Sequence, residues 1–209
     1  GGRGALTERT GGHIDTGGLV PVSMAGQMPA ALIQLPQHAF GEEALQSEDS
    51  VKSGYDIDVT ALRESLTARF GGEWKILFRG HHVVANQDEM TGFDGDVSAY
   101  PDMMPLLCAA DVLITDYSSS MWDMSLMKKP VFLYCTDLNG YISERDFFTP
   151  IREWPYPMAE NNAELNKNIR LFDEKAYEAN VKTHHETLGN CESGHAARDA
   201  AEWIVKQCK

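Results

Sequence analysis

The chain has 209 residues, of which 43% are hydrophobic and 23% charged, so it is long enough to build one globular α/β domain with a sizeable core. Its formal net charge of −13 argues against a broad basic surface that grips nucleic acid or an anionic membrane. Any phosphate group that it binds must therefore be held by a local site.

Its four cysteines form no C-x-x-C pair and have no histidine at ligand spacing, so we expect free thiols in a reducing cytosol (Cys108, Cys135, Cys191 and Cys208). No apolar run approaches the roughly 18 residues of a membrane span, and the N-terminus lacks the apolar core of a signal peptide. We expect a soluble chain, and the missing initiator methionine suggests a fragment.

Residues 1–54 contain ten of the 18 glycines and only short apolar stretches, among them Ala30 to Leu35. Such composition specifies little regular structure. We interpret this segment as a loose extension or the remnant of a truncated N-terminal domain. The folded domain is predicted to occupy residues 55–209.

From Tyr55 onward, predicted helices and strands alternate. Asp58 is a plausible N-cap for a helix over 59–70, which Gly71 and Gly72 end. The strands are predicted at 74–78, 111–115 and 131–135, and the further helices at 101–110, 119–129, 161–172, 174–189 and 194–207. Short apolar strands that alternate with helices are the signature of βαβ units. The sequence therefore predicts an α/β fold with a parallel, Rossmann-like sheet covered by helices on both faces.

The first candidate site follows the predicted strand at 111–115, where the chain reads Asp116, Tyr117 and three serines. Ligands of open α/β sheets bind outside the carboxyl ends of the strands. A serine N-cap there would place hydroxyl and backbone N–H donors beside the positive end of a helix dipole, which suits an anion. The alternative is that one serine caps the helix and the others are merely solvated. Asp116 would repel a phosphate, so we expect it to orient the loop or to receive a hydroxyl.

The second candidate site follows the strand at 74–78 and consists of Arg79, Gly80, His81 and His82. Arginine offers a planar fork for phosphate oxygens, and histidine can protonate a leaving oxygen near neutral pH. The alternative is an exposed or packed histidine pair without a role.

Two further groups are interpreted as structural. His184 and His185 lie in a predicted polar helix and are assigned to the surface. Asp94 and Asp96 have the spacing of a metal-binding pair but lie in a Gly-rich loop, so we expect a turn there and no metal site. No cofactor is expected.

The combination of motifs is more specific than either candidate site. ADVLITDYSS, then KKPVFLY, then Asp137 and Tyr141, with ILFRGHH upstream, resembles the C-terminal half of the CDP-glycerol glycerophosphotransferases, which prime or polymerise teichoic acids of bacterial surfaces. The resemblance covers residues 55 to about 207 and includes ESGHAARDAAEWI near the end. It implies a GT-B arrangement, in which two Rossmann-like domains face each other and the C-terminal one holds the CDP-activated donor.

By this resemblance, Ser118, Ser119 and Ser120 would contact the diphosphate of CDP-glycerol or CDP-ribitol, with Asp116 beside them. Arg79 and His81 would match the family's Arg-x-His element and be catalytic. His81 would stabilise charge on the diphosphate and help CMP to leave, while a hydroxyl of a polyol-phosphate or lipid-linked acceptor attacks the distal phosphorus.

The chain departs from the family at its beginning. No acceptor domain is recognisable in residues 1–54, and the strand that usually opens the donor domain is missing before Tyr55. We therefore expect donor binding without efficient turnover, in a cytoplasmic protein that meets the inner face of the membrane only through an N-terminal domain.

Two alternatives stay open. One is a GT-B glycosyltransferase domain that uses a UDP- or GDP-sugar, with Glu192 before Gly194 holding ribose hydroxyls. The other is a noncatalytic nucleotide-binding domain whose serine turn only caps a helix.

Overall fold

The computed structural model describes residues 28–34, 57–80, 92–144 and 147–208. Its six strands form one parallel sheet in the order β3-β2-β1-β4-β5-β6. The strands are β1 (Ala30–Gln34), β2 (Lys75–Arg79), β3 (Gly95–Asp96), β4 (Val112–Thr115), β5 (Val131–Tyr134) and β6 (Met158–Ala159). The chain builds the sheet outward from β1 in one direction and then from β4 in the other, which is the order of doubly wound nucleotide-binding sheets.

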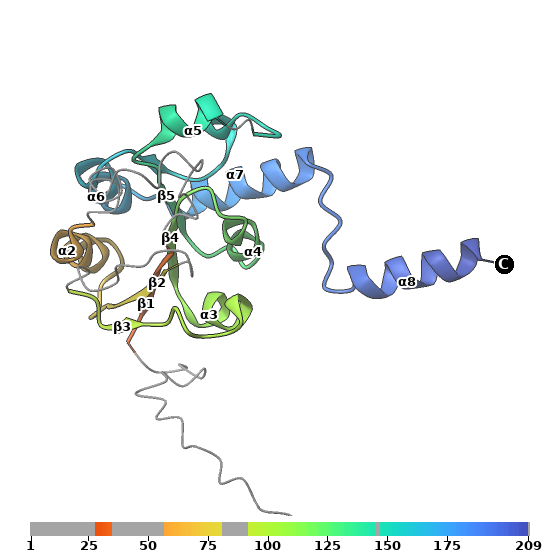
Figure 1. Ribbon diagram of the computed structural model, residues 1–209, viewed down its shortest axis with the longest axis horizontal. Coiled ribbons are helices and arrows are strands. Elements are labelled where there is room, and N and C mark those ends of the chain that lie inside the picture. The colour runs from red at the N-terminus through yellow and green to blue at the C-terminus, as the bar shows by residue number, and fades with distance from the viewer. Residues whose placement is uncertain (1–27, 35–56, 81–91, 145–146, 209) are drawn as a thin grey trace, which may run out of the picture.

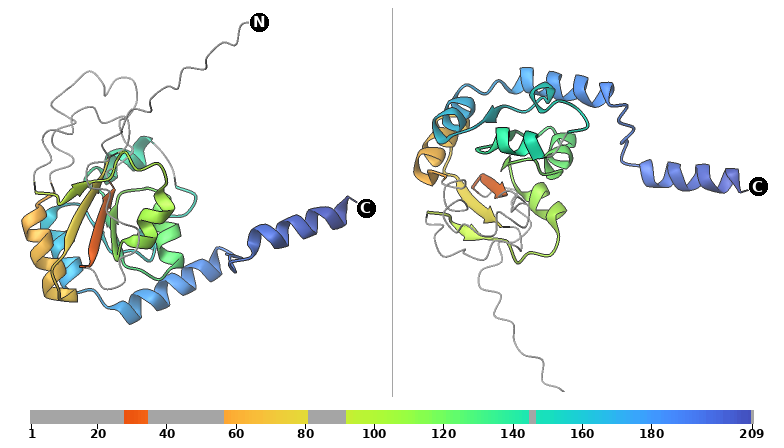
Figure 2. Two further views of the ribbon diagram at one scale, coloured as in Figure 1. Left: turned by 90° about the horizontal axis from the view of Figure 1, so that it is seen from below. Right: turned by 45° about the horizontal axis from the view of Figure 1, so that its top comes forward.

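Helices cover both faces of this sheet, as Figures 1 and 2 show: α2 and α6 lie on one face, and α3 and α4 on the other. The helices are α2 (Val59–Phe70), α3 (Met103–Ala109), α4 (Ser120–Leu126), α5 (Leu138–Glu144), α6 (Asn162–Arg170), α7 (Glu174–Thr187) and α8 (Ala196–Gln207). Every residue of β4 and β5 is buried, as expected for parallel strands between two helix layers. The predicted parallel α/β fold is confirmed.

The central strand β1 comes from the segment that the sequence pattern leaves unspecified. Ala31 pairs with Ile76 of β2 on one side and with Val112 of β4 on the other. Residues 30–33 are at most 2% exposed. The sheet thus begins before Tyr55, where the sequence pattern places the start of the domain. The rest of residues 1–54, apart from Met28 and Pro29, lies outside the described residues.

The two ends of α2 follow the predicted cap chemistry. Asp58 Oδ1 accepts a hydrogen bond from the Ala61 N–H at 2.9 Å, and Gly71 ends the helix with a φ of 73°, a conformation that suits glycine. Arg63 and Asp94 then join α2 to the sheet edge through an ion pair of 2.9 Å. The Asp94 carboxylate also accepts from the Ile76 N–H at 2.8 Å, so it fastens the β2–β3 connection.

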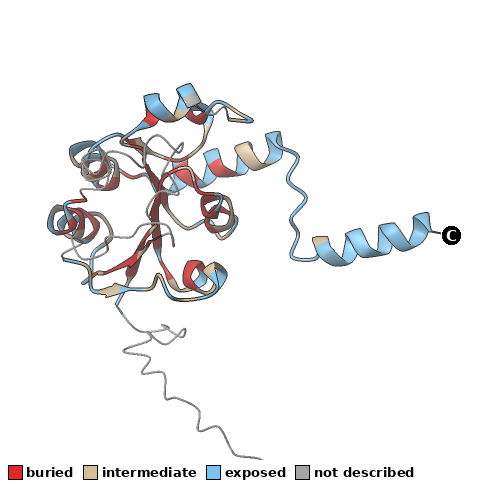
Figure 3. Cartoon of the chain, in the orientation of Figure 1, coloured by how far each residue is buried: buried red, intermediate tan, exposed pale blue. Residues whose placement is uncertain are grey.

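Helix α8 stands away from the body of the molecule and none of its residues is buried (Figure 3). Its apolar side chains include Trp203, Ile204 and Val205, which are 55–63% exposed. Within the described part of the chain, no helix is long and apolar enough to cross a membrane.

Candidate functional site

The reversal of strand order lies between β1 and β4, which run side by side with Ile33 opposite Ile114. The chain leaves β4 through residues 116–119, called here the serine turn, and enters α4 at Ser120. Doubly wound sheets bind ligands in the crevice outside the carboxyl ends of their strands, at the point where the order reverses. The serine turn therefore occupies the expected ligand position of this fold.

The three serines have different surroundings. Ser118 and Ser120 are 6% and 5% exposed, whereas Ser119 is exposed. Ser120 Oγ lies 2.5 Å from Gln34 Oε1 and 3.0 Å from Ser118 Oγ. Because each hydroxyl has a single proton, this geometry describes a chain in which Ser118 donates to Ser120 and Ser120 donates to Gln34. The Ser118 and Ser120 hydroxyls are thus used inside the protein.

Ser119 is the N-cap residue of α4, and its side chain makes no capping hydrogen bond. A simple capping role would require its oxygen to accept from a first-turn N–H group. Its exposed hydroxyl lies instead at the surface of the switch point. Of the three predicted contact residues, Ser119 is the one that is exposed.

Gln34 was missed by the sequence analysis. It ends β1, is half-buried, and reaches Ser120 across a sequence separation of 86 residues. The sequence offers little indication that Gln34 belongs to the site, because a glutamine at the end of an apolar run is common. Only the adjacency of β1 and β4 reveals it.

Asp116 is 2% exposed, so its carboxylate lies beneath the serine turn and not on its surface. The Thr115 hydroxyl lies 3.5 Å from Asp116 Oδ1. Burial, together with the charge of Asp116, raises the pKa of the Cys135 thiol, which follows β5. This position fits a residue that orients the loop and does not fit direct contact with a phosphate.

Tyr117 connects the serine turn to the segment that follows β5. Its hydroxyl donates to Asp137 Oδ1 at 2.9 Å. Its ring stacks on Tyr141 of α5 with centroids 3.9 Å apart and planes at 17°. The sequence analysis noted Asp137 and Tyr141 only as part of a resemblance, and the structure shows that both contact Tyr117.

Arg79 ends β2 and lies at the same sheet edge as the serine turn, with β1 between them. Its Nη1 donates to the carbonyl oxygens of Val97 and Tyr100 at 3.1 and 2.7 Å. The guanidinium group therefore fastens the β3–α3 loop, a role that the sequence did not predict. His81 and His82 lie outside the described residues.

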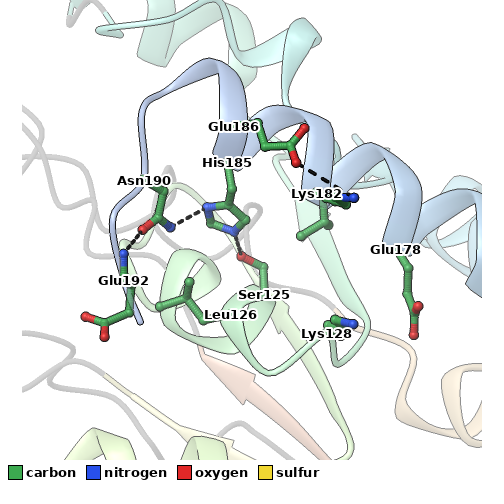
Figure 4. A pocket seen from close by; sticks show the side chains of 10 residues that line it. Ser125, Leu126, Lys128, Glu178, Lys182, His185, Glu186, Asn190 and Glu192 are labelled. Carbon is green, nitrogen blue, oxygen red and sulfur yellow. Dashed lines mark hydrogen bonds and ion pairs between the residues drawn. The ribbon is translucent and has the colours of Figure 1, made fainter. Parts of the chain in front are cut away.

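Glu192 and Gly194 lie in the exposed connection between α7 and α8. Glu192 lines a pocket with Ser125 and Leu126, at the opposite end of α4 from Ser119 (Figure 4). Its carboxylate accepts from the Gly194 N–H at 2.6 Å. The structure does not bring this predicted ribose-binding pair together with the serine turn.

His184 and His185 were predicted to lie on the surface, whereas the structure shows both half-buried and in contact with other side chains. His184 stacks on Trp122 with centroids 5.3 Å apart and planes at 7°. His185 Nε2 lies 2.9 Å from the buried hydroxyl of Ser125. Both follow Tyr177 and Val181 at helical spacing, and that stripe was the signal that could have revealed their packing.

These contacts make the stability of the fold depend on pH. Burial lowers the pKa of His185, and burial followed by the His185 charge lowers that of His184. The unfolded chain therefore takes up protons first as the pH falls below about 6.5, and stability is lost there. Urea unfolding at about pH 7.5 and about pH 5.5 measures how much unfolding free energy is lost between these two pH values. This loss should be smaller in His185→Gln than in the wild type. An equal loss in both proteins would contradict this account.

Within the residues that the structure describes, no three His, Cys, Asp or Glu side chains gather to form a metal site. Asp94, one of the two acids at metal-binding spacing, is engaged by Arg63, Lys75 and Ile76. Asp96 Oδ1 accepts from the Ser98 N–H at 2.8 Å.

A parallel sheet whose strand order reverses between β1 and β4, with helices on both faces, places this chain in the class of doubly wound, Rossmann-like α/β folds. The sequence profile of the CDP-Glycerol:Poly(glycerophosphate) glycerophosphotransferase family matches residues 46–206. The chain belongs to this family.

Characterised relatives agree with this assignment. The chain is 34% identical over 170 residues to the teichoic acid glycerol-phosphate transferase of Staphylococcus aureus (strain NCTC 8325 / PS 47), covering 79% of this chain and 42% of the relative. It is 27% identical over 172 residues to the teichoic acid poly(glycerol phosphate) polymerase of Bacillus subtilis (strain 168), covering 79% of this chain and 22% of the relative. The chain thus spans less than half the length of these relatives.

The solved structure of the wall teichoic acid polymerase TagF has the same fold. Its TM-score is 0.63 at 22% sequence identity, over 89% of this chain and 45% of that chain. A variant of that polymerase has been solved after a soak with CDPG.

Proposed function

We propose that this chain is the donor-binding part of a polyol-phosphate transferase and that it holds CDP-glycerol or CDP-ribitol at the serine turn. The observation that carries the proposal is Ser119, which is exposed at the switch point of the sheet and whose side chain makes no capping hydrogen bond. The family to which the chain belongs is named for its action on CDP-glycerol. The CDPG soak of the related polymerase supports the same donor. The net charge of −13 makes this local polar site more important, since the protein has no overall positive field.

The proposed reaction is an in-line displacement at the distal phosphorus of the donor. The acceptor hydroxyl forms a new P–O bond, the bond to CMP breaks, and the acceptor proton passes to a base outside this segment. Ser119 and the N–H groups of the turn would stabilise the diphosphate, while His81 and Arg79 would stabilise charge as CMP leaves. The acceptor would be a polyol phosphate or a lipid-linked polyol at the cytoplasmic face of the membrane.

Because the chain spans less than half of its relatives, we expect donor binding but inefficient turnover from this segment alone. Positioning donor and acceptor together supplies a large part of such a rate enhancement. A GT-B arrangement with an acceptor domain, which would also make any peripheral membrane contact, completes the proposal.

Calorimetric titration with a panel of CDP-glycerol, CDP-ribitol, a UDP-sugar and a GDP-sugar tests the donor class. We expect heat of binding with one or both CDP-polyols and weaker binding of the two sugar nucleotides. Ser119→Ala and His81→Ala should weaken binding, whereas Ser193→Ala, a matched serine change in the α7–α8 connection, should not. Absence of heat with the wild type at millimolar CDP-glycerol would remove the proposal, and tighter binding of a sugar nucleotide would favour a glycosyltransferase.

If the domain were noncatalytic and Ser119 only capped α4, Ser119→Ala would lower the stability of the fold and leave nucleotide affinity unchanged. Loss of a capping side chain costs about 1 kcal/mol of stability. Since the Ser119 side chain makes no capping bond, we expect Ser119→Ala to change nucleotide affinity and to leave the unfolding free energy nearly unchanged.

A further inference from the structure

We propose that Tyr117 is a positioning residue, which holds the serine turn in its ligand-binding shape through the hydrogen bond to Asp137. This inference rests on the proposed function, because the shape of the turn matters only if the turn binds a diphosphate. It assigns a role to a side chain that lies between the predicted contact residues and contacts Asp137 and Tyr141.

The first observation is the path of the side chain. Tyr117 lies directly between Asp116 and Ser118, and its side chain reaches the segment that follows the neighbouring strand β5. Asp137 and Tyr141 thus hold the middle of the turn from outside it. Any movement of the Tyr117 backbone would displace Ser119, which is only two residues away.

The second observation is that two different contacts restrain the same ring. The Tyr117 ring stacks on Tyr141 with centroids 3.9 Å apart, and the Phe147 ring is tilted against it at a centroid distance of 5.6 Å. Such ring contacts fix the plane of the Tyr117 ring but allow it to shift within that plane. The 2.9 Å hydrogen bond to Asp137 fixes the hydroxyl at one point. Ring packing alone would serve stability, whereas the hydrogen bond adds a defined position.

The third observation concerns the chemistry of this hydrogen bond. Burial, the neighbouring Cys135 thiol and the Asp137 carboxylate all raise the pKa of Tyr117, so its hydroxyl stays protonated and donates. A hydrogen bond to a carboxylate is charge-assisted and stronger than one between neutral groups. The contact is therefore suited to fix geometry over the whole physiological pH range.

A double-mutant cycle tests the inference with Tyr117→Phe, Asp137→Ala and the double variant. Tyr117→Phe keeps the ring and removes only the hydroxyl. We expect each single variant to weaken CDP-glycerol binding by about tenfold, and the double variant to lose less affinity than the two single losses combined, because both single variants remove the same Tyr117–Asp137 bond. Asp137→Asn should restore much of the affinity, since its side-chain oxygen still accepts.

Tyr177→Phe is the matched control. Tyr177 is 3% exposed and its hydroxyl donates to the Lys129 carbonyl oxygen at 2.9 Å, away from the serine turn. It should lower the melting temperature without changing CDP-glycerol affinity.

The outcomes separate the two proposals. If the wild type binds CDP-glycerol and Tyr117→Phe binds it equally well, the positioning role is wrong and the proposed function stands. If the cycle shows coupling in the unfolding free energy but none in affinity, the hydrogen bond is structural only and the inference is also overturned. If the wild type binds no CDP-polyol, the proposed function fails first and the positioning role fails with it.

Discussion

A chain shortened to residues 55–209 should not fold, because the cut removes β1 from the centre of the sheet. Both neighbours of β1 would lose a complete ladder of hydrogen bonds and the packing of Leu32 and Ile33, which are each 1% exposed. Truncation of one such side chain to alanine typically costs about 2–5 kcal/mol, and a whole domain is stable by only about 5–15 kcal/mol. Loss of the strand therefore exceeds what the remaining fold can tolerate.

Far-UV circular dichroism and thermal unfolding of the shortened chain measure this effect. The matched control is a chain of residues 28–209, which retains β1 and should unfold cooperatively. Cooperative unfolding of residues 55–209 near the temperature of the control would show that β1 is dispensable and that the description of the core is wrong.

Ser119→Asp should separate anion binding from helix capping, because the two roles predict effects of opposite sign. The charge of an aspartate suits the start of a helix, so the free energy of unfolding should stay equal or rise by up to about 1 kcal/mol. A carboxylate about 4 Å from a diphosphate is repelled by several kcal/mol at the dielectric of a protein surface, so we expect affinity for CDP-glycerol to fall at least about 100-fold.

The neutral variant Ser119→Asn provides the comparison. It has similar size and capping ability but no charge, so its affinity should fall far less than that of Ser119→Asp. Calorimetry with CDP-glycerol and thermal unfolding of both variants give the two quantities. Equal affinities of the aspartate and asparagine variants would show that no phosphate lies beside residue 119.

Much of the fold could be predicted because its signals are local. The strands β2, β4 and β5 are nearly continuous apolar runs, and Asp58 and Gly71 mark the ends of α2 by cap chemistry. The strand β1 could not be assigned in the same way. Its four apolar residues and Gln34 lie in a Gly-rich segment with no nearby predicted helix to complete a βαβ pattern, and their partners Lys75 to Arg79 and Val112 to Ile114 lie far along the chain.

The candidate site was predictable in position but not in detail. The order of strand, hydroxyl cluster and helix located the serine turn, because this feature depends only on neighbouring residues. The different roles of Ser118, Ser119 and Ser120 depend on Gln34, which approaches from β1. The structural role of Arg79 likewise depends on carbonyl groups of a loop that no local pattern could place beside it.

The most direct test of the account is a crystal structure of this protein with CDP-glycerol bound. We expect the diphosphate at the carboxyl ends of β1 and β4, with a phosphate oxygen about 3 Å from Ser119 Oγ. A nucleotide bound instead between α4 and α7, near Ser125 and Glu192, would contradict the central claim that the serine turn holds the donor.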